Sequence, residues 1–425
     1  MSLRPDPFLA VAISGGGTRA AAFGAGVMQE LCRWRRDGVP LIRHVALLST
    51  VSGGSIAGGW WCVHQPAKAD DVVPFILGFC AKDHKGPLLG GLALPHRWWD
   101  YATQRSEVFA DYLERVLYGG RAPRLSELEV SPLWLCNATD VDSGRPFVVE
   151  SRHLGWIGVA PEDISVARAT AASAAFPILT NPITLANRGT DVSPPAWVEP
   201  ALGGGAIPDI GLRRRAEDWR RYATSGGSSW VHLVDGGLAD NTGVRNMLRR
   251  LALPPDEASP GQSLYQSVMR SPHGPRRLAL IAVNAGTPGL TGASRKQRGP
   301  SGWAVLKAAA KSSMNLRSDE SMDLLDEWLR SFATRAAESP SKLRVKRGPG
   351  LAWNLGGKRV GFAIGLSFDH VQDSNLRARL KAVDTDYWPT REEVLALVKA
   401  GSALLRKDKD FLGLCCSAGF KLGED

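Results

Sequence analysis

Near its N-terminus the chain twice passes from a short apolar run, through consecutive glycines, into a segment with helical spacing. In the first unit the apolar run is Phe8–Ile13, the glycines are Gly15–Gly17, and residues 20–34 carry apolar side chains four positions apart. In the second unit Val45–Thr50 leads into Ser52-Gly53-Gly54 and another helix. Strands that are apolar on both faces are typical of the interior of a parallel sheet. The chain is therefore predicted to have an α/β fold, with helices covering a mostly parallel sheet.

Later segments continue this pattern of strands and helices. Further strands are expected over residues 133–138, 146–150, 229–234, 278–283 and 359–367. Further helices are expected over the alanine-rich residues 166–175 and over residues 306–337.

No composition shift divides the chain into separate units. We therefore expect a single domain over residues 8–406, followed by a C-terminal tail over residues 407–425. Three segments rich in Gly, Pro and Ser are expected to be loop or helical insertions: about residues 191–228, 254–275 and 286–302.

The net charge of the chain favours anionic partners. Its 52 Lys and Arg residues exceed its 42 Asp and Glu residues, which gives a formal net charge of +10. The basic groups are short and dispersed, and we interpret them as solvated surface: Arg213–Arg215, Arg276–Arg277 and Lys346–Arg347. No zinc-finger spacing or RNA-binding aromatic motif accompanies them, so no nucleic acid partner is expected.

The cysteines and the N-terminus predict a cytoplasmic protein. Six cysteines are scattered without CxxC spacing, which is typical of a reducing compartment and gives no zinc or redox motif. Residues 1–8 lack the apolar core of a signal peptide. Val45–Val63 is uncharged and as long as a membrane span. Its serines and glycines favour a strand, a turn and a helix instead, so no transmembrane helix is predicted.

Ser52 lies where a catalytic nucleophile is expected. An apolar strand leads into it, and Gly53 and Gly54 follow, as the sharp turn between a strand and a helix requires. The positive end of the following helix would stabilise an alkoxide. The GxSxG pattern is imperfect because its first position is Thr50. Ser55 is an alternative nucleophile that lies further into the helix, and a capping serine without catalytic function is a second alternative.

The first glycine loop is suited to bind a negative oxygen. Consecutive glycines after a strand allow backbone N–H groups to converge on an oxyanion, and the three residues are Gly15, Gly16 and Gly17. A plain tight turn and a nucleotide-binding loop are the alternatives. The loop lacks both the ending of a P-loop and the glycine order of a dinucleotide fingerprint.

Asp235 is the expected base. It ends an apolar strand and precedes Gly236 and Gly237, and ligands in sheet enzymes commonly lie at such strand ends. A turn-forming aspartate is the alternative. His232 precedes Asp235 by three positions, so on a strand it faces the other way and is not expected to be catalytic. The pattern favours a Ser-Asp dyad over a triad.

Taken in order, these motifs resemble those of the patatin-like phospholipases, relatives of the cytosolic phospholipase A2 group. The resemblance rests on Ser14–Arg19, on Val51–Ser55 and on Asp235–Gly237, with weaker matches at Asn137–Asp140 and in the helix that ends before Pro177. Thr50 and Ala20 stand where glycine is frequent in the family. The resemblance implies a three-layer fold with helices on both faces of the sheet.

The resemblance also implies a lipid acyl hydrolase. Ser52 would attack the ester carbonyl, Asp235 would accept the proton, and Gly15–Gly17 would hold the oxyanion. Arg19 would steady the glycine loop or meet a phosphate, while a surface arginine is the alternative. Gly53, Gly54, Gly236 and Gly237 would support the two turns. Neither a metal nor another cofactor is implied.

The substrate is expected to be a phospholipid or another acyl ester, at an anionic membrane surface. The motivation is the positive charge together with Trp60-Trp61 and Trp98-Trp99, although core packing is the alternative for the first pair. The basic segment Arg213–Arg221, which contains Trp219, is a candidate lid. A catalytically inactive patatin fold that serves as a binding or regulatory module is the alternative to an enzyme.

Overall fold

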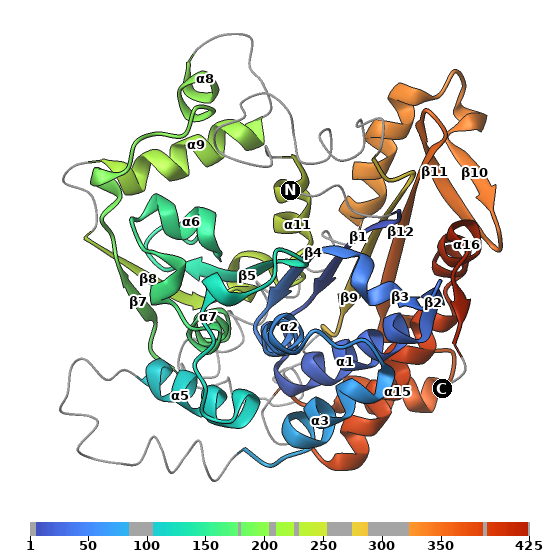
Figure 1. Cartoon of the computed structure of the whole chain (residues 1–425), viewed down its shortest axis with the longest axis horizontal. Helices are drawn as coiled ribbons and strands as arrows, with labels where there is room; N and C mark the ends of the chain where they lie inside the picture. The colour runs from blue at the N-terminus through green and yellow to red at the C-terminus, as the bar shows by residue number, and fades with distance from the viewer. Residues whose placement is uncertain are drawn as a thin grey trace, which may run out of the picture.

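The computed structural model describes residues 6–84, 105–176, 180–203, 210–224, 229–252, 274–287, 323–385 and 389–423. A ten-stranded mixed sheet runs through the molecule in the order β10-β11-β12-β9-β1-β4-β5-β8-β7, with β6 paired to β5 (Figure 1). Its five central strands are parallel to one another: β12 (Arg359–Ser367), β9 (Arg277–Asn284), β1 (Phe8–Ile13), β4 (Val45–Val51) and β5 (Leu133–Asp140). The outer strands pair antiparallel: β10 (Arg344–Arg347), β11 (Gly350–Gly356), β6 (Pro146–Val149), β8 (Trp230–Asp235) and β7 (Ile183–Ala186).

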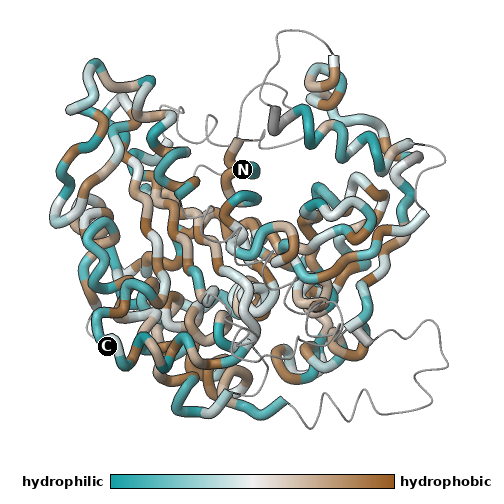
Figure 2. Tube along the Cα trace, turned by 180° about the vertical axis from the view of Figure 1, so that it is seen from behind, coloured by the Kyte–Doolittle hydropathy of each residue, from teal (hydrophilic) through white to brown (hydrophobic). Residues whose placement is uncertain are grey.

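Helices cover both faces of the sheet, which confirms the predicted three-layer α/β fold. One face is covered by α1 (Gly17–Arg33), α2 (Gly53–His64), α7 (Val166–Ser173) and α15 (Arg391–Lys407). The other is covered by α11 (Val244–Ala252) and a helix over residues 323–336. Alternate residues of β1 enter the two hydrophobic cores: Leu9, Val11 and Ile13 the first, and Phe8, Ala10 and Ala12 the second. Figure 2 shows the hydrophobic residues concentrated along these central strands.

The remaining helices lie around this framework (Figure 1). They are α3 (Val73–Phe75), α5 (Arg105–Tyr118), α6 (Ser151–Trp156), α8 (Val198–Leu202), α9 (Ile210–Ala223), α10 (Gly237–Asp240), α14 (Ser374–Ala382) and α16 (Lys409–Ala418). A separate small sheet is formed by β2 (Trp34–Arg36), β3 (Val39–Pro40) and β13 (Lys421–Leu422).

The apolar stretch Val45–Val63 folds as β4, the Ser52 turn and most of α2. Trp60 and Trp61 on α2 are buried, so core packing accounts for them. In the described part of the chain, no helix combines the length and apolarity that a membrane crossing requires.

Residues 213–221, the candidate lid, form part of a helix whose tryptophan is buried. This segment belongs to α9, which is mostly hydrophilic (Figure 2). Trp219 nevertheless is buried, as are Ala216 and Tyr222 on the same helix face. Because an amphipathic helix buries its apolar stripe, Trp219 anchors α9 to the core and does not contact solvent.

The predicted insertions and tail are only partly described. Residues 191–228 include α8 and α9, whereas most of the other two insertions, and Trp98-Trp99, lie outside the described residues. In the expected tail, α16 buries Phe411, Leu414 and Cys415, so the first core continues beyond residue 406.

Candidate active site

Ser52 occupies a strained turn between β4 and α2. Its φ is 51° and its ψ −120°, a conformation that residues other than glycine rarely adopt. The glycines that follow have no room for a side chain. A Cβ on Gly53 would lie 1.9 Å from the Gly17 carbonyl oxygen, and one on Gly54 would lie 2.5 Å from that of Ile13. The elbow therefore packs directly on the backbone of the glycine loop.

Asp235 reaches Ser52 because β4 and β8 meet end to end. Val51, the last residue of β4, pairs with Asn137 of β5, and Asp235, the last of β8, pairs with Ala138. The other side of both β5 residues is occupied by β6, so β4 and β8 lie on the same side of β5. Since β8 is antiparallel to β5 and β4 is parallel to it, their C-terminal ends face each other. The predicted location at a strand end is correct, although β8 is not a parallel strand.

The two predicted catalytic side chains form a hydrogen bond. Ser52 Oγ donates to Asp235 Oδ2 at 2.8 Å. Ser52 is 6% exposed and Asp235 is 1% exposed. The Gly237 amide donates to the other carboxylate oxygen at 2.8 Å. Burial raises the pKa of Asp235 to about 6, and the hydrogen bonds from Gly237 and Ser52 oppose this shift. A carboxylate with such a pKa is suited to take a proton near neutral pH.

His232 and Ser55, the weighed alternatives, take no part in this pair. His232 is exposed, and one of its ring nitrogens bonds to the Thr184 hydroxyl at 2.9 Å. The Ser55 hydroxyl bonds instead to the hydroxyls of Thr50 at 2.9 Å and Ser173 at 2.8 Å. Thr50, in place of the elbow glycine, thus belongs to a buried hydroxyl chain behind Ser52.

One of the three amides of the glycine loop is already hydrogen-bonded within the protein. The Gly15 amide donates to the Asn241 carbonyl at 2.8 Å and is not available to an oxyanion. A Cβ at Gly15 would lie 3.3 Å from the Ser52 Cβ, so this glycine permits close approach. Gly16 and Gly17 have φ values of 139° and 57° and begin α1. Within the described residues, their backbone amides donate no hydrogen bond to a protein acceptor, as is usual for the first N–H groups of a helix.

Arg19 is buried, which excludes the alternative of a surface arginine. Its Nη1 donates to the Val383 carbonyl at 2.8 Å and to the Thr287 hydroxyl at 3.2 Å. Burial lowers the pKa of its guanidinium to about 10, and Asp384 opposes the shift. Its Nη2 lies 3.6 Å from the position of a Cβ on Gly16. Arg19 therefore joins the glycine loop to the segment before α15.

Two residues that hold the site together, Ser173 and Asn241, received no individual role from the sequence. Ser173 of α7 accepts a hydrogen bond from the Ser52 amide at 2.9 Å and donates to the Asn137 carbonyl at 2.5 Å. Asn241 fixes Gly15 as described above. In Ala169–Ala175, only Thr170 and Ser173 carry a hydroxyl, and the other residues are alanines. The hydroxyl of Ser173 was the sequence signal that could have identified this residue.

Comparison with known structures finds remote likeness to human GIVD cytosolic phospholipase A2. One structure has 13% sequence identity and a TM-score of 0.47, and the match covers 97% of this chain and 63% of that chain. A second, in complex with methyl gamma-linolenyl fluorophosphonate and terbium chloride, has 14% identity and a TM-score of 0.42, with 97% and 58% covered. The chain thus spans less than two thirds of the length of either.

No curated protein sequence matches the chain. The sequence model of the family described as patatin-like phospholipase matches residues 11–248, which is more than half of the chain. The match includes the glycine loop, the Ser52 elbow and the Asp235 turn. The protein therefore belongs to the patatin-like phospholipase family.

Proposed function

We propose that the protein is a serine acyl hydrolase that cleaves acyl esters of lipids, in the manner of a phospholipase A or lysophospholipase. The observation that carries the proposal is the 2.8 Å hydrogen bond from the Ser52 hydroxyl to the buried Asp235 carboxylate. Family membership supports a lipid ester as the substrate class.

In the first half of the reaction, Ser52 Oγ attacks the ester carbonyl while its proton passes to Asp235 Oδ2. The negative oxygen of the tetrahedral intermediate is stabilised by the amides of Gly16 and Gly17. We assign the oxyanion role to these two and leave out Gly15, whose amide is occupied by Asn241. The intermediate expels the alcohol, which takes the proton from Asp235, and the acyl group stays on Ser52.

In the second half, water attacks the acyl-enzyme and gives a proton to Asp235. The fatty acid leaves, and the proton returns to Ser52 Oγ. A base with a pKa of about 6 is ionised at neutral pH at the start of each step. No histidine is needed as an intermediary, because the carboxylate touches the nucleophile directly.

Arg19 supports a phosphate-bearing substrate. It is buried beside the glycine loop, and within the described residues its Nε has no hydrogen-bond partner. The positive charge of this guanidinium, close to the glycine loop, favours an anionic phosphate near Ser52. We therefore propose a phospholipid substrate, met by a peripheral cytoplasmic protein at a membrane surface. We also propose that the hydrolase domain extends through α16, because Phe411 and Leu414 are buried.

The test combines covalent labelling with lipid analysis. A fluorophosphonate probe should label the wild type and the Ser55→Ala variant, but not Ser52→Ala. Mixed phospholipids incubated with the wild type should release fatty acids, measured by mass spectrometry, and Ser52→Ala should release none. Labelling that survives in Ser52→Ala would move the nucleophile elsewhere. A folded wild type with neither labelling nor turnover would favour the inactive binding module.

A further inference from the structure

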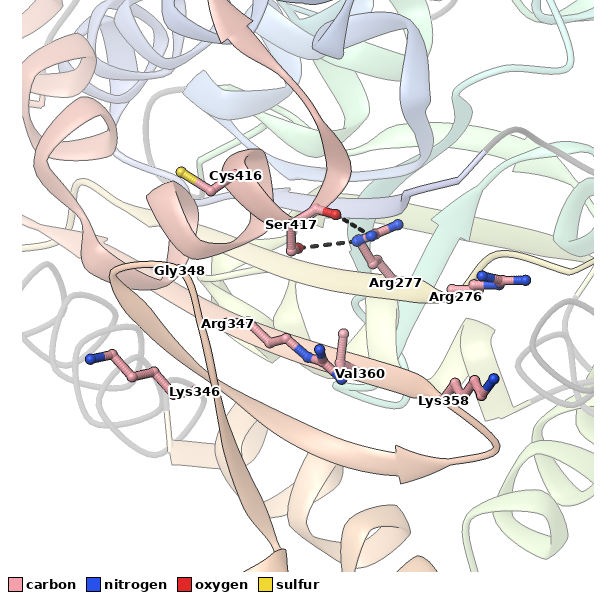
Figure 3. Close-up of a pocket in the computed structure, with 9 residues that line it drawn as sticks. All are labelled: Arg276, Arg277, Lys346, Arg347, Gly348, Lys358, Val360, Cys416 and Ser417. Atoms are coloured by element: carbon pink, nitrogen blue, oxygen red, sulfur yellow. Dashed lines mark hydrogen bonds between the residues drawn. The ribbon is translucent and has the colours of Figure 1, made fainter.

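A cavity of about 520 Å³ lies between the start of β9, the start of β12, the β10–β11 hairpin and α16 (Figure 3). Five of its nine lining residues are cationic and none is acidic: Arg276, Arg277, Lys346, Arg347, Gly348, Lys358, Val360, Cys416 and Ser417. The sequence pairs Arg276–Arg277 and Lys346–Arg347, which we interpreted as separate solvated groups, thus converge in space.

The side chains of four of these cations have no acidic partner in the described part of the chain, although the Arg276 backbone amide donates to Asp6. Arg276, Lys346, Arg347 and Lys358 are exposed, and no ion pair joins them to a described carboxylate. Arg277 differs, because its guanidinium pairs with Asp6 and donates to Ser417. In Figure 3 the Arg347 side chain extends beside Val360, at the centre of the group, while Arg276 and Lys358 lie at one end.

Such clustered charge of one sign makes the electrostatic potential of the pocket positive. A concave surface lined by one sign of charge attracts oppositely charged ligands more strongly than an open surface does. Arginine guanidinium groups and lysine ammonium groups are the usual hydrogen-bond donors to phosphate oxygens. A cavity of this size suits a small head group, whereas an extended nucleic acid strand requires a long groove.

The cavity lies at the N-terminal ends of the parallel strands, whereas Ser52 lies at their C-terminal ends. Val360 pairs with Arg277 at the beginning of the parallel strands β12 and β9. Ser52 follows the end of β4, which runs in the same direction as both through β1. The length of a strand therefore separates the cations from Ser52, and the cavity cannot hold the ester that Ser52 attacks.

We propose that this cavity is a second ligand site, which binds a head group bearing several phosphates. The source of the head group is either a soluble polyphosphate or a phosphoinositide lipid, since both present the same chemistry. Neutralisation of the four cations supplies the affinity, and the concave shape supplies the preference for clustered phosphates over single ones.

The experiment uses the full chain and two double variants that each remove one Arg and one Lys. Arg347→Ala with Lys358→Ala alters the cavity. Arg391→Ala with Lys399→Ala is the matched control, because both residues are exposed on α15, outside the lining. Calorimetry measures binding of inositol trisphosphate and of inorganic phosphate. Flotation measures binding to phosphatidylcholine vesicles that contain either a phosphatidylinositol bisphosphate or phosphatidylserine.

The wild type and the control should bind inositol trisphosphate more tightly than inorganic phosphate. The cavity variant should bind it at least about tenfold more weakly, since each surface cation contributes on the order of a fivefold factor. Preference for bisphosphate vesicles, lost in the cavity variant, would identify a lipid source, and binding of the soluble head group alone would identify a free ligand.

Three results would overturn the proposal: no binding of inositol trisphosphate, equal losses in both double variants, or measurable vesicle binding that is equally strong for both kinds of charged vesicle. Cleavage of a soluble short-chain ester should be the same in both double variants. This readout separates failure of the second site from failure of the proposed hydrolase, because it depends on the Ser52-Asp235 site and not on the cavity.

Discussion

The backbone amide of Ser52 donates a 2.9 Å hydrogen bond to the hydroxyl of Ser173, which belongs to a different helix, 121 positions later in the chain. This contact fixes the elbow in its left-handed conformation. A residue that is not glycine persists at positive φ only where its surroundings hold it there. The geometry of the nucleophile therefore depends on α7 as well as on its own turn.

We predict that Ser173→Ala lowers both stability and turnover. The change leaves the Ser52 amide and the Asn137 carbonyl without their partner, which costs about 1–3 kcal/mol for buried groups. Denaturant unfolding measures the stability, and the rate of fluorophosphonate labelling reports the nucleophile. Ser331→Ala removes an exposed serine hydroxyl and should change neither. A labelling rate in Ser173→Ala equal to that of the wild type would show that the elbow is held without it.

We predict that kcat/KM follows the ionisation of Asp235. Burial raises the pKa of this carboxyl group to about 6. The base is protonated below that pH and ionised above it, so activity should rise with pH through about 6 and then level off. Below the midpoint it should fall by about tenfold per pH unit. Initial rates on a soluble ester, with circular dichroism at each pH as the folding control, provide the check. A midpoint near 4 would contradict the assignment.

We predict that Asp235→Asn strongly lowers turnover and stabilises the fold at neutral pH. The pKa of Asp235 rises from its ordinary value of 3.8 to about 6 in the folded protein. The folded protein therefore binds the carboxyl proton more tightly than the unfolded chain does. The ionised carboxylate therefore costs stability above pH 6, up to about 3 kcal/mol, and the cost disappears as pH falls through the window toward 3.8.

Parallel unfolding curves for the wild type and Asp235→Asn measure this difference. The variant should be the more stable at pH 7 and equal to the wild type near pH 4. Its turnover should fall by about 10²–10⁴-fold, which is the usual contribution of a general base. A variant that is less stable than the wild type at pH 7 would be inconsistent with a desolvated carboxylate.

We predict that Gly53→Ala disrupts the site, whereas Gly155→Ala does not. A Cβ on Gly53 would lie 1.9 Å from the carbonyl oxygen of Gly17. Because the contacted atoms are backbone atoms, no side chain can rotate away to remove the clash. The cost should be at least about 3 kcal/mol. Gly155 lies in α6 with no atom within 4 Å of its added Cβ, so alanine there should be neutral or stabilising by up to about 1 kcal/mol. Thermal unfolding of the two variants decides between these outcomes.

Local sequence patterns predicted the central strands and the two side chains that we propose to be catalytic. Apolar runs followed by glycines mark β1 and β4 because buried parallel strands are apolar on both faces and glycines allow the sharp turn into a helix. The same logic located Ser52 and Asp235. The inward face of α9 was detectable as well, since Ala216, Trp219 and Tyr222 are three positions apart, although the many arginines of that helix obscured it.

Other features depend on contacts between distant segments. The end-to-end meeting of β4 and β8 follows from their shared register on β5, and no local pattern encodes that register. Likewise, the Gly15 amide donates to the carbonyl of Asn241. The number of consecutive glycines therefore predicted one more amide for an oxyanion than the loop can supply. The basic cavity was hidden for the same reason, since its residues come from separate parts of the chain.

The late position of α15 in the chain has a consequence for synthesis. Arg406 on this helix binds Glu30 of α1 at 2.7 Å, and Val383 just before it binds Arg19 beside the glycine loop. A nascent chain, or a fragment that stops at residue 248, has neither contact and also lacks β9, the neighbour of β1. The proposed hydrolytic activity should accordingly appear only after residues 383–406 have left the ribosome. Translation itself then sets the time at which the proposed activity first appears.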